Sequence, residues 1–261
     1  MEIKNKNIDN GRAFDWGKVS DDYAKFRDIY PQEFYEKIVG RNLCKDGQSV
    51  LDVGTGTGVL PRNMYKHGAK WTAVDISENQ IKMAKILSKG TDIDYFAVPT
   101  ERIDFADNSF DVITACQCFW YFDHDKVMPK FYKMLKPNGS ILVLYMAWLP
   151  FEDKIASASE KLVLKCNTNW SGKDEYVHEI EVPDCYNEHF DTVYHEEFTV
   201  KIPFTREAWN GRMKACRGIG ATLTQSEIAS WEQEHIKLLE NIAPKEFEVI
   251  HYIAIKELKK K

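Results

Sequence analysis

A glycine-rich segment near residue 54 has the residue types and spacing to hold a nucleotide. It reads Val50-Leu51-Asp52-Val53-Gly54-Thr55-Gly56-Thr57-Gly58. An apolar run that leads into closely spaced glycines and then into a helical pattern is typical of a strand–loop–helix nucleotide site. Glycine is needed there because a side chain would keep the main chain away from the ligand.

A carboxylate at the end of the next predicted strand adds to this pattern. Asp75 ends the apolar run 70–75, where it could accept hydrogen bonds from both hydroxyls of a ribose. These two features alone would also suit a nicotinamide dinucleotide. The dinucleotide spacing G-x-G-x-x-G, however, puts its third position at Val59, and Gly58 comes one residue early. A nicotinamide-dependent oxidoreductase therefore remains an alternative.

The spacing G-x-G-x-G, with Asp52 two residues before the first glycine, resembles motif I of the class I S-adenosylmethionine (SAM)-dependent methyltransferases. Two later segments share the resemblance. Residues 100–112, TERIDFADNSFDV, are similar to the family's A-E-x-L-P-F-x-D-x-S-F-D-V, and residues 131–139, FYKMLKPNG, to its R-x-L-K-P-G-G turn. Together these segments resemble the methyltransferase type 11 domain over about residues 48–146.

This resemblance implies S-adenosyl-L-methionine as the cofactor and S-adenosylhomocysteine as the product. Asp52 would hold the ammonium group of the cofactor, directly or through water, and Asp75 its ribose. Pro99 stands where the family often has an acid, so adenine contacts are expected from the backbone near Thr100 and from packing by Ile76. The full set of expected cofactor-binding residues is Asp52, Gly54, Thr55, Gly56, Gly58, Asp75, Ile76, Thr100, Glu101, Cys116 and Gln117.

A narrower resemblance links two segments to trans-aconitate-methyltransferase-like enzymes. Residues 23–31, YAKFRDIYP, are similar to the Y-x-x-[FY]-R-P-x-Y-P start of these enzymes, with Asp28 in place of the first proline. Residues 115–123, ACQCFWYFD, are similar to A-x-Q-A-x-H-W-F-D, with Trp120 in place of the histidine. The resemblance implies that both segments border the methyl-transfer site and leaves the acceptor open.

Methyl transfer from a sulfonium is an in-line displacement, which requires alignment and exclusion of water more than a catalytic side chain. His124 is the candidate base if the acceptor arrives protonated, whereas a carboxylate acceptor needs no base. Helical spacing could bring Arg206, Met213 and Arg217 toward one another, so that one or more of them could grip an acceptor carboxylate; the alternative is solvated helix charges. The expected acceptor-side residues are Tyr23, Trp120, Tyr121, Trp148 and Arg206, with Trp170 as a further aromatic candidate.

The remaining histidines and the cysteines show no metal-ligand spacing, so no metal site is expected. Most of His67, His178, His189, His195, His235 and His251 are expected at the surface. The six dispersed cysteines are typical of reduced thiols in a cytoplasmic protein. Cys116 and Cys118 alternate along a predicted strand, which favours small buried side chains over redox or arsenic chemistry.

The elements that position these residues alternate between strand and helix. Helical spacing covers 20–39 and is split at Pro31. Strands are predicted at 49–53, 70–75, 94–98, 110–116 and 140–146, with helices at 60–66, 79–88 and 126–135 between them. Further helices are predicted at 151–165, 205–216 and 226–239, with strands at 192–201 and 247–256. Residues 1–12 and 259–261 are expected to be disordered.

The pattern predicts an α/β protein with a Rossmann-like, doubly wound, mostly parallel seven-stranded sheet. We expect one SAM-methyltransferase domain over 1–261. Within it, 13–42 would form a helical N-terminal cover and 43–147 the SAM-binding core. Residues 148–246, inserted after the fifth strand, would form the acceptor side, and 247–258 the last strand.

Composition limits the partners. The net charge of −5 disfavours nucleic acid, whose phosphates require a basic surface. A [DN]-P-P-[YFW] motif, typical of amino-methylating nucleic-acid enzymes, is also missing after the fourth strand. The chain has no apolar run long enough to span a membrane and no signal-peptide pattern, so we expect a cytoplasmic protein. The sequence thus predicts a methyltransferase acting on a small molecule, with a carboxylate acceptor as the narrower expectation and a non-catalytic SAM-binding protein as a further alternative.

Overall fold

The structure, a computed structural model, describes residues 2–261. Its main feature is a seven-stranded sheet with the strand order β3-β2-β1-β4-β5-β7-β6. The strands are β1 (Ser49–Val53), β2 (Lys70–Asp75), β3 (Asp94–Ala97), β4 (Phe110–Cys116), β5 (Leu135–Trp148), β6 (Phe190–Thr205) and β7 (Glu246–Lys260).

Eight α-helices and several short 3-10 helices connect these strands in the described part of the chain. The α-helices are α1 (Ser20–Phe26), α2 (Gln32–Gly40), α3 (Val59–Met64), α4 (Glu78–Leu87), α5 (His124–Met134), α6 (Lys154–Cys166), α7 (Arg206–Lys214) and α8 (Gln225–Ile242). The 3-10 helices include η1 (Asp9–Gly11), η4 (Thr100–Arg102) and η5 (Phe119–Tyr121).

Strands β1 to β5 pair in parallel, and β1 lies between β2 and β4. The register sets Asp52 of β1 beside Ala73 of β2 and Thr114 of β4. Parallel pairing brings the carboxyl ends of these strands to the same edge of the sheet, where ligands bind in open α/β folds. The predicted mostly parallel, doubly wound seven-stranded sheet is confirmed.

The central strands are apolar because both of their faces are covered. Four of the five residues of β1 are buried, as are five of the seven in β4. Buried parallel strands therefore read as continuous apolar runs rather than alternating ones. Local signals set the helix starts: Ser77 caps α4 by accepting a hydrogen bond from the Gln80 amide, and Pro31 precedes α2.

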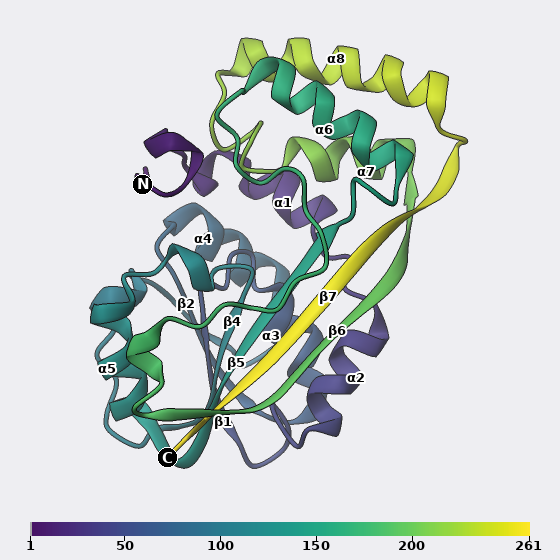
Figure 1. Cartoon of the computed structure of the whole chain (residues 1–261). Coiled ribbons are helices and arrows are strands. Elements are labelled where there is room, and N and C mark those ends of the chain that lie inside the picture. Colours follow the sequence, from purple (N-terminus) through teal and green to yellow (C-terminus); the bar gives the residue numbers. More distant parts are fainter. Residues whose placement is uncertain (1) are drawn as a thin grey trace. The chain divides into compact units, whose positions relative to one another are not determined.

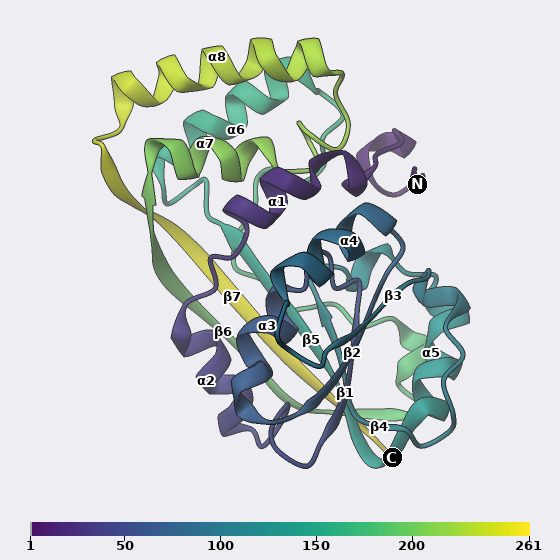
Figure 2. The same ribbon diagram turned by 180° about the vertical axis from the view of Figure 1, so that it is seen from behind.

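The chain divides into two compact units. Unit 2 consists of Tyr30–Met146, His178–Phe198 and Ile253–Lys261, and unit 1 of the residues up to Ile29, Ala147–Val177 and Thr199–Tyr252. In unit 2, helices α2 and α5 lie on opposite sides of the strands (Figure 1). In unit 1, helix α7 packs against both α1 and α8, and α6 packs against α8, an arrangement that the reverse view also shows (Figure 2).

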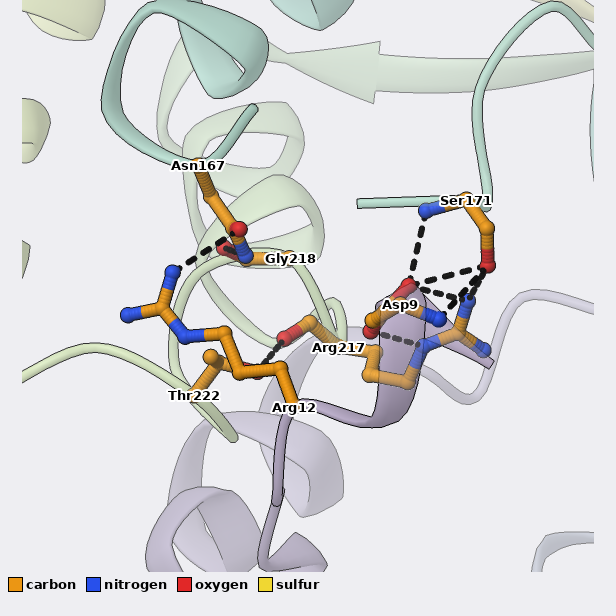
Figure 3. A network of polar contacts seen from close by, with 7 residues as sticks. All are labelled: Asp9, Arg12, Asn167, Ser171, Arg217, Gly218 and Thr222. Atoms are coloured by element: carbon orange, nitrogen blue, oxygen red, sulfur yellow. Dashed lines mark hydrogen bonds and ion pairs between the residues drawn. The ribbon is translucent and has the colours of Figure 1, made fainter. Parts of the chain in front are cut away.

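The expectation that residues 1–12 are disordered is wrong for the part that the structure describes, 2–12; Met1 lies outside it. Ile3 forms a bridge with Phe14, and Asp9 in η1 is buried. Asp9 accepts hydrogen bonds from the main-chain N–H of Ser171 at 2.7 Å and from Nε of Arg217 at 2.7 Å (Figure 3). Long-range side-chain contacts of this kind order the segment. The local spacing of apolar residues in the sequence does not reveal such contacts.

The expected disorder at the other end is also wrong. Lys259 and Lys260 belong to β7. The Lys260 ammonium donates hydrogen bonds to the main-chain oxygens of Tyr132 and Leu135. Among residues 2–261, no helix is both long enough and apolar enough to cross a membrane.

Candidate functional site

The glycine loop follows β1 in unit 2 and is held in a conformation that favours glycine. Gly54, Gly56 and Gly58 have φ angles of 63°, 56° and 75°, all in the left-handed region. The N–H of Thr55 donates to the main-chain oxygen of Val74 at 2.9 Å, which ties the loop to β2. The loop therefore turns sharply at the carboxyl ends of two neighbouring strands.

Two of these glycines also leave no room for a side chain. A Cβ on Gly54 would lie 2.7 Å from Sγ of Cys118. A Cβ on Gly58 would collide with the hydroxyl of Tyr95. The side chains of Cys118 and Tyr95 therefore pack closely against the loop. The Cys118 thiol also donates a hydrogen bond to the main-chain oxygen of Val53 at 3.0 Å. This agrees with the expected small, buried role of Cys118.

Asp75, at the end of β2, uses both carboxylate oxygens to hold the backbone. Oδ2 accepts from the N–H of Gly56 at 2.9 Å, and Oδ1 accepts from the N–H of Ser77 at 2.8 Å. Burial raises the pKa of Asp75, and these two N–H groups oppose that rise. Each oxygen keeps lone pairs that can accept from the ribose hydroxyls of a nucleoside.

Asp52 is the second acid of the site and is almost completely buried. Its Oδ1 accepts from the hydroxyl of Thr114 on β4 at 2.6 Å. Burial raises the pKa of Asp52 to about 7; the Thr114 hydrogen bond opposes the rise, and the charge of Asp75 adds to it. A cationic group placed beside Asp52 would favour its ionised form. The sequence did not point to Thr114, although its position on the neighbouring strand fits this role.

The expected adenine side lies after β3. Thr100 is buried at the start of η4, directly after Pro99. Glu101 is partly buried, and its Oε1 accepts from the N–H of Asp123 at 3.2 Å. Ile76 is partly exposed beside Asp75. Their assignment to adenine stays a prediction.

At the end of β4, Gln117 takes a left-handed backbone conformation with φ of 64°. Its N–H donates to the main-chain oxygen of Leu144 at 2.9 Å, and its Nε2 donates to that of Met146 at 2.5 Å. The Cys116 thiol donates to the hydroxyl of Tyr30 at 3.3 Å. Sparsely populated backbone conformations cluster at functional sites, where surrounding contacts hold them in place. Here two hydrogen bonds to β5 stabilise the conformation.

The aromatic residues predicted for the acceptor side are distributed over both units. In unit 2, Trp120 is 38% exposed and meets Tyr145 edge-on at a ring distance of 4.8 Å, with Tyr121 next to it. In unit 1, Trp148 is buried and its Nε1 donates to Glu160 at 2.6 Å. Tyr23 is partly buried in α1. Trp120 is therefore the most accessible of these aromatic side chains, and the acceptor role of each stays a prediction.

Trp170, the further aromatic candidate, is buried in unit 1. Its ring centre lies 6.4 Å from that of Trp148. Cβ atoms built on Gly172 and Gly218 would contact its ring. These contacts describe packing inside unit 1.

His124 opens α5, and its Nδ1 lies 3.1 Å from the hydroxyl of the buried Tyr186. Burial lowers the pKa of His124, and a hydrogen bond with the Phe119 backbone and the nearby acids Asp123, Asp125 and Glu101 oppose that change. Burial therefore favours the neutral form of the imidazole. A neutral imidazole can accept a proton, so the geometry is compatible with the predicted base.

Two of the arginines predicted to grip an acceptor have structural partners instead. Nε of Arg206 donates to the main-chain oxygen of Ala243, just past the end of α8, at 2.9 Å. Arg217 forms an ion pair with Asp9. Met213, which was predicted to lie near these two arginines, is fully buried. The acceptor role of Arg206 stays a prediction, to which these contacts lend no support.

The expected surface position of the histidines is wrong for His235 and His251, which are both fully buried in unit 1. Nδ1 of His235 lies 2.8 Å from Oδ1 of Asn210, and Nε2 lies 2.9 Å from Oγ of Ser159. Burial lowers the pKa of His235 to about 4. Buried imidazoles are stable when neutral and hydrogen-bonded, which explains this position.

The loop residues fit an adenosyl cofactor. The glycines leave the main chain open, and Asp75 offers lone pairs at the end of β2. The hydroxyl of Thr57, within the loop, is buried and has no hydrogen-bond partner among the described residues. Buried polar groups normally have a partner, so this hydroxyl fits a ligand that completes the site. Thr57 was not among the predicted site residues.

Comparisons with known proteins agree with this geometry. Residues 51–143 match the family model described as "Methyltransferase domain". A ubiquinone biosynthesis O-methyltransferase of Idiomarina loihiensis is 38% identical over 99 residues, which are 36% of this chain and 41% of the relative. An uncharacterized methyltransferase-like protein of Schizosaccharomyces pombe is 29% identical over 135 residues, which are 51% of each chain. The matches thus span about half the length of these relatives.

Solved structures show the same fold. YjhP of E. coli aligns with a TM-score of 0.54 at 17% identity and covers 94% of this chain and 99% of its own. YcgJ of Bacillus subtilis aligns with a TM-score of 0.54 at 17% identity and covers 88% of this chain and 100% of its own. Residues 51–143 thus form a methyltransferase domain, and the chain has the fold of the class I SAM-dependent methyltransferases. This match implies S-adenosyl-L-methionine as the cofactor.

Proposed function

We propose that this protein transfers a methyl group from SAM to a small-molecule acceptor by in-line displacement. The observation that carries the proposal is the left-handed glycine loop held against Asp75. The loop leaves main chain exposed to a ligand, and Asp75 is positioned to bind a ribose. This combination supports cofactor binding at the carboxyl ends of β1 and β2.

SAM supplies an activated methyl group on a sulfonium. The protein residues hold and orient the reacting groups. Asp75 anchors the ribose while keeping its bonds to Gly56 and Ser77. Asp52, supported by Thr114, provides a negative charge for the cofactor ammonium. Gln117 and Cys116 border the methyl side at the end of β4. Fixed alignment of this kind contributes most of the rate when the methyl donor is already activated.

Several observations support a small molecule as the acceptor. The names of the relatives include ubiquinone biosynthesis O-methyltransferases, which are small-molecule enzymes by name. The net charge of −5 disfavours a polyanionic partner. Trp120 and Tyr145 offer an aromatic surface in unit 2, suited to a flat or cationic group. For a hydroxyl acceptor His124 is the base we propose, whereas a carboxylate acceptor needs none.

The test has two stages. Calorimetric titration with SAM, S-adenosylhomocysteine, NAD and NADH should give micromolar binding of the first two alone. Binding of a nicotinamide cofactor instead would favour an oxidoreductase. The second stage incubates the protein with methyl-labelled SAM and a panel of small carboxylic acids and phenols, with products detected by mass spectrometry. SAM binding without a product across the panel would favour a non-catalytic SAM-binding protein.

A further inference from the structure

Four aromatic rings form a continuous row in unit 2, called here the aromatic row. The ring centre of Tyr145 lies 4.8 Å from that of Trp120, which it meets edge-on at 89°, and 6.0 Å from that of His178. On the other side of Trp120, the ring centre of Tyr121 lies 5.7 Å away. The aromatic row therefore joins β5, η5 and the segment of unit 2 that begins at His178.

Tyr145 lies at the edge of the sheet where the glycine loop turns. Cys116 of β4 pairs with Leu144 of β5, so Tyr145 is the next residue along β5. The N–H and Nε2 of Gln117 donate to the main-chain oxygens of Leu144 and Met146, which flank Tyr145. The carboxyl ends of β4 and β5 therefore hold the aromatic row, and ligands of open parallel sheets bind at these ends.

Trp120 lies close to the glycine loop along the chain. Cys118, two residues earlier, packs against the loop, since a Cβ on Gly54 would lie 2.7 Å from its Sγ. Trp120 follows directly in the 3-10 helix η5. The aromatic row therefore begins within two residues of a side chain that contacts the proposed cofactor site.

The far end of the aromatic row is anchored to β7. His178 lies in a segment without helix or strand, and its Nδ1 lies 3.0 Å from the main-chain oxygen of Glu179. The buried Lys256 of β7 donates to the main-chain oxygen of Ile180 at 2.6 Å and forms an ion pair with Glu179. The segment that carries His178 is thus tied to the sheet although it has no regular structure.

Trp120 is more exposed than any other tryptophan in residues 2–261. Its exposed fraction is 38%, whereas Trp16 is partly buried and the other five tryptophans are buried. Aromatic pairs attract one another at ring distances of about 4.5–7 Å, in stacked or edge-on arrangements. An exposed indole that neighbouring rings hold in place therefore offers a surface onto which a flat ligand can stack.

We propose that the methyl acceptor is an aromatic ring bearing a hydroxyl, which stacks on Trp120 beside Tyr145. The acceptor role of the aromatic row rests on the proposed function and narrows its acceptor. Aliphatic acids have no flat face for these rings, and the two arginines predicted to hold a carboxylate, Arg206 and Arg217, have structural partners.

An aromatic hydroxyl also suits the reaction, because its pKa is about 10, as in tyrosine, and its anion is a good nucleophile. During transfer, the acceptor O–H bond and the C–S bond to the sulfonium break, and an O–CH3 bond forms. The proton passes to His124, the base proposed above. The products are an aryl methyl ether and S-adenosylhomocysteine.

Catechol and cis-cyclohexane-1,2-diol are matched probes, because both carry two neighbouring hydroxyls and only catechol has an aromatic ring. Calorimetric titration of the full chain, with and without saturating S-adenosylhomocysteine, should give about tenfold tighter binding of catechol than of the diol. W120L should remove this preference, whereas W120F should keep part of it. Y145L should reduce the preference because it removes the ring that meets Trp120 edge-on.

F96L is the matched control. Phe96 on β3 is an exposed ring of the same unit that lies outside the aromatic row, so F96L should keep the wild-type preference. Tryptophan fluorescence provides a second measurement if W120L fails to fold, as judged by its melting temperature. Catechol should quench the fluorescence of the wild type, and W120F, which keeps a ring at this position, should lose most of that change.

Equal binding of the two probes by the wild type, or a preference that W120L and F96L retain alike, overturns the proposal. Titration with S-adenosylhomocysteine tests the cofactor site separately, and W120L should bind it as the wild type does. Absence of that binding contradicts the proposed function, whereas loss of the catechol preference with cofactor binding intact contradicts the aromatic acceptor.

Mass spectrometry after incubation with methyl-labelled SAM tests the acceptor role directly. Methylated catechol, with a KM that W120L raises about tenfold and a kcat that it leaves nearly unchanged, supports the proposal. Methylation of an aliphatic acid alone, or catechol bound to the aromatic row without a methylated product, overturns the aromatic acceptor.

Discussion

Binding of SAM should release a proton from Asp52, and its affinity should therefore depend on pH. The pKa of Asp52 is about 7 because burial disfavours its charge. The cofactor ammonium favours the ionised carboxylate. With a pKa near 7, the Asp52 carboxyl is ionised in about half of the protein molecules at pH 7 and in about one hundredth of them at pH 5. The affinity for SAM should fall by about 50-fold over this interval.

The assay is calorimetric titration of SAM at pH 5, 6 and 7 in buffers of different ionisation enthalpy, which also count the released protons. D52N is the decisive variant, because its side-chain oxygen can still accept from Thr114 while the residue stays neutral. Its affinity should change little over this range. T114V should raise the pKa further and move the pH dependence upward. Wild-type affinity that is constant from pH 5 to 7 would show that Asp52 does not lose a proton when SAM binds.

The same proton affects the stability of the protein without cofactor. The folded state binds the Asp52 proton more tightly than the unfolded chain does, since folding raises the pKa of Asp52 from 3.8 to about 7. The contribution of Asp52 to stability is thus greatest below about pH 4 and falls as pH rises to about 7. The upper limit of this loss is about 4 kcal/mol. Urea unfolding should therefore show D52N to be more stable than wild type at pH 8.

Three further predictions concern other residues. Asp75→Ala should weaken SAM binding by about 1–3 kcal/mol through lost hydrogen bonds to the ribose; unchanged affinity in a folded variant by calorimetry would sink that assignment. Gly58→Ala should abolish measurable SAM binding because the new Cβ meets the Tyr95 hydroxyl at a left-handed position, and Tyr95→Phe in the same chain should restore part of it. Arg217→Met should destabilise the fold by about 3 kcal/mol in urea unfolding, because it leaves Asp9 buried without its ion pair; a smaller loss than for Lys25→Gln, which breaks the exposed ion pair with Glu207, would contradict this.

The core of the fold could be predicted because its strands are continuous apolar runs. The predicted bounds of β1, β2 and β4 match those of the structure. The helix break at Pro31 and the cap at Ser77 were also confirmed, since each depends on one residue and its neighbours. Local sequence patterns were therefore enough to predict the strands and helix ends near the expected cofactor site.

Features that depend on distant partners could not be predicted. The order of residues 2–12 depends on Ser171 and Arg217, which lie far away in the sequence. The burial of His235 had a readable signal, because Ile228, Trp231, His235 and Leu239 recur every three or four residues on α8. The burial of Arg212 had no such signal, since its spacing in α7 does not distinguish it from Arg206.

The ion pair between Asp9 and Arg217 also constrains how this chain can change over evolutionary time. Neither charge tolerates burial alone, so a substitution at one position favours a compensating substitution at the other. The intermediate with one charge removed is selected against even when both end states fold. Among homologues, these two positions should therefore vary together although they lie 208 positions apart in the sequence.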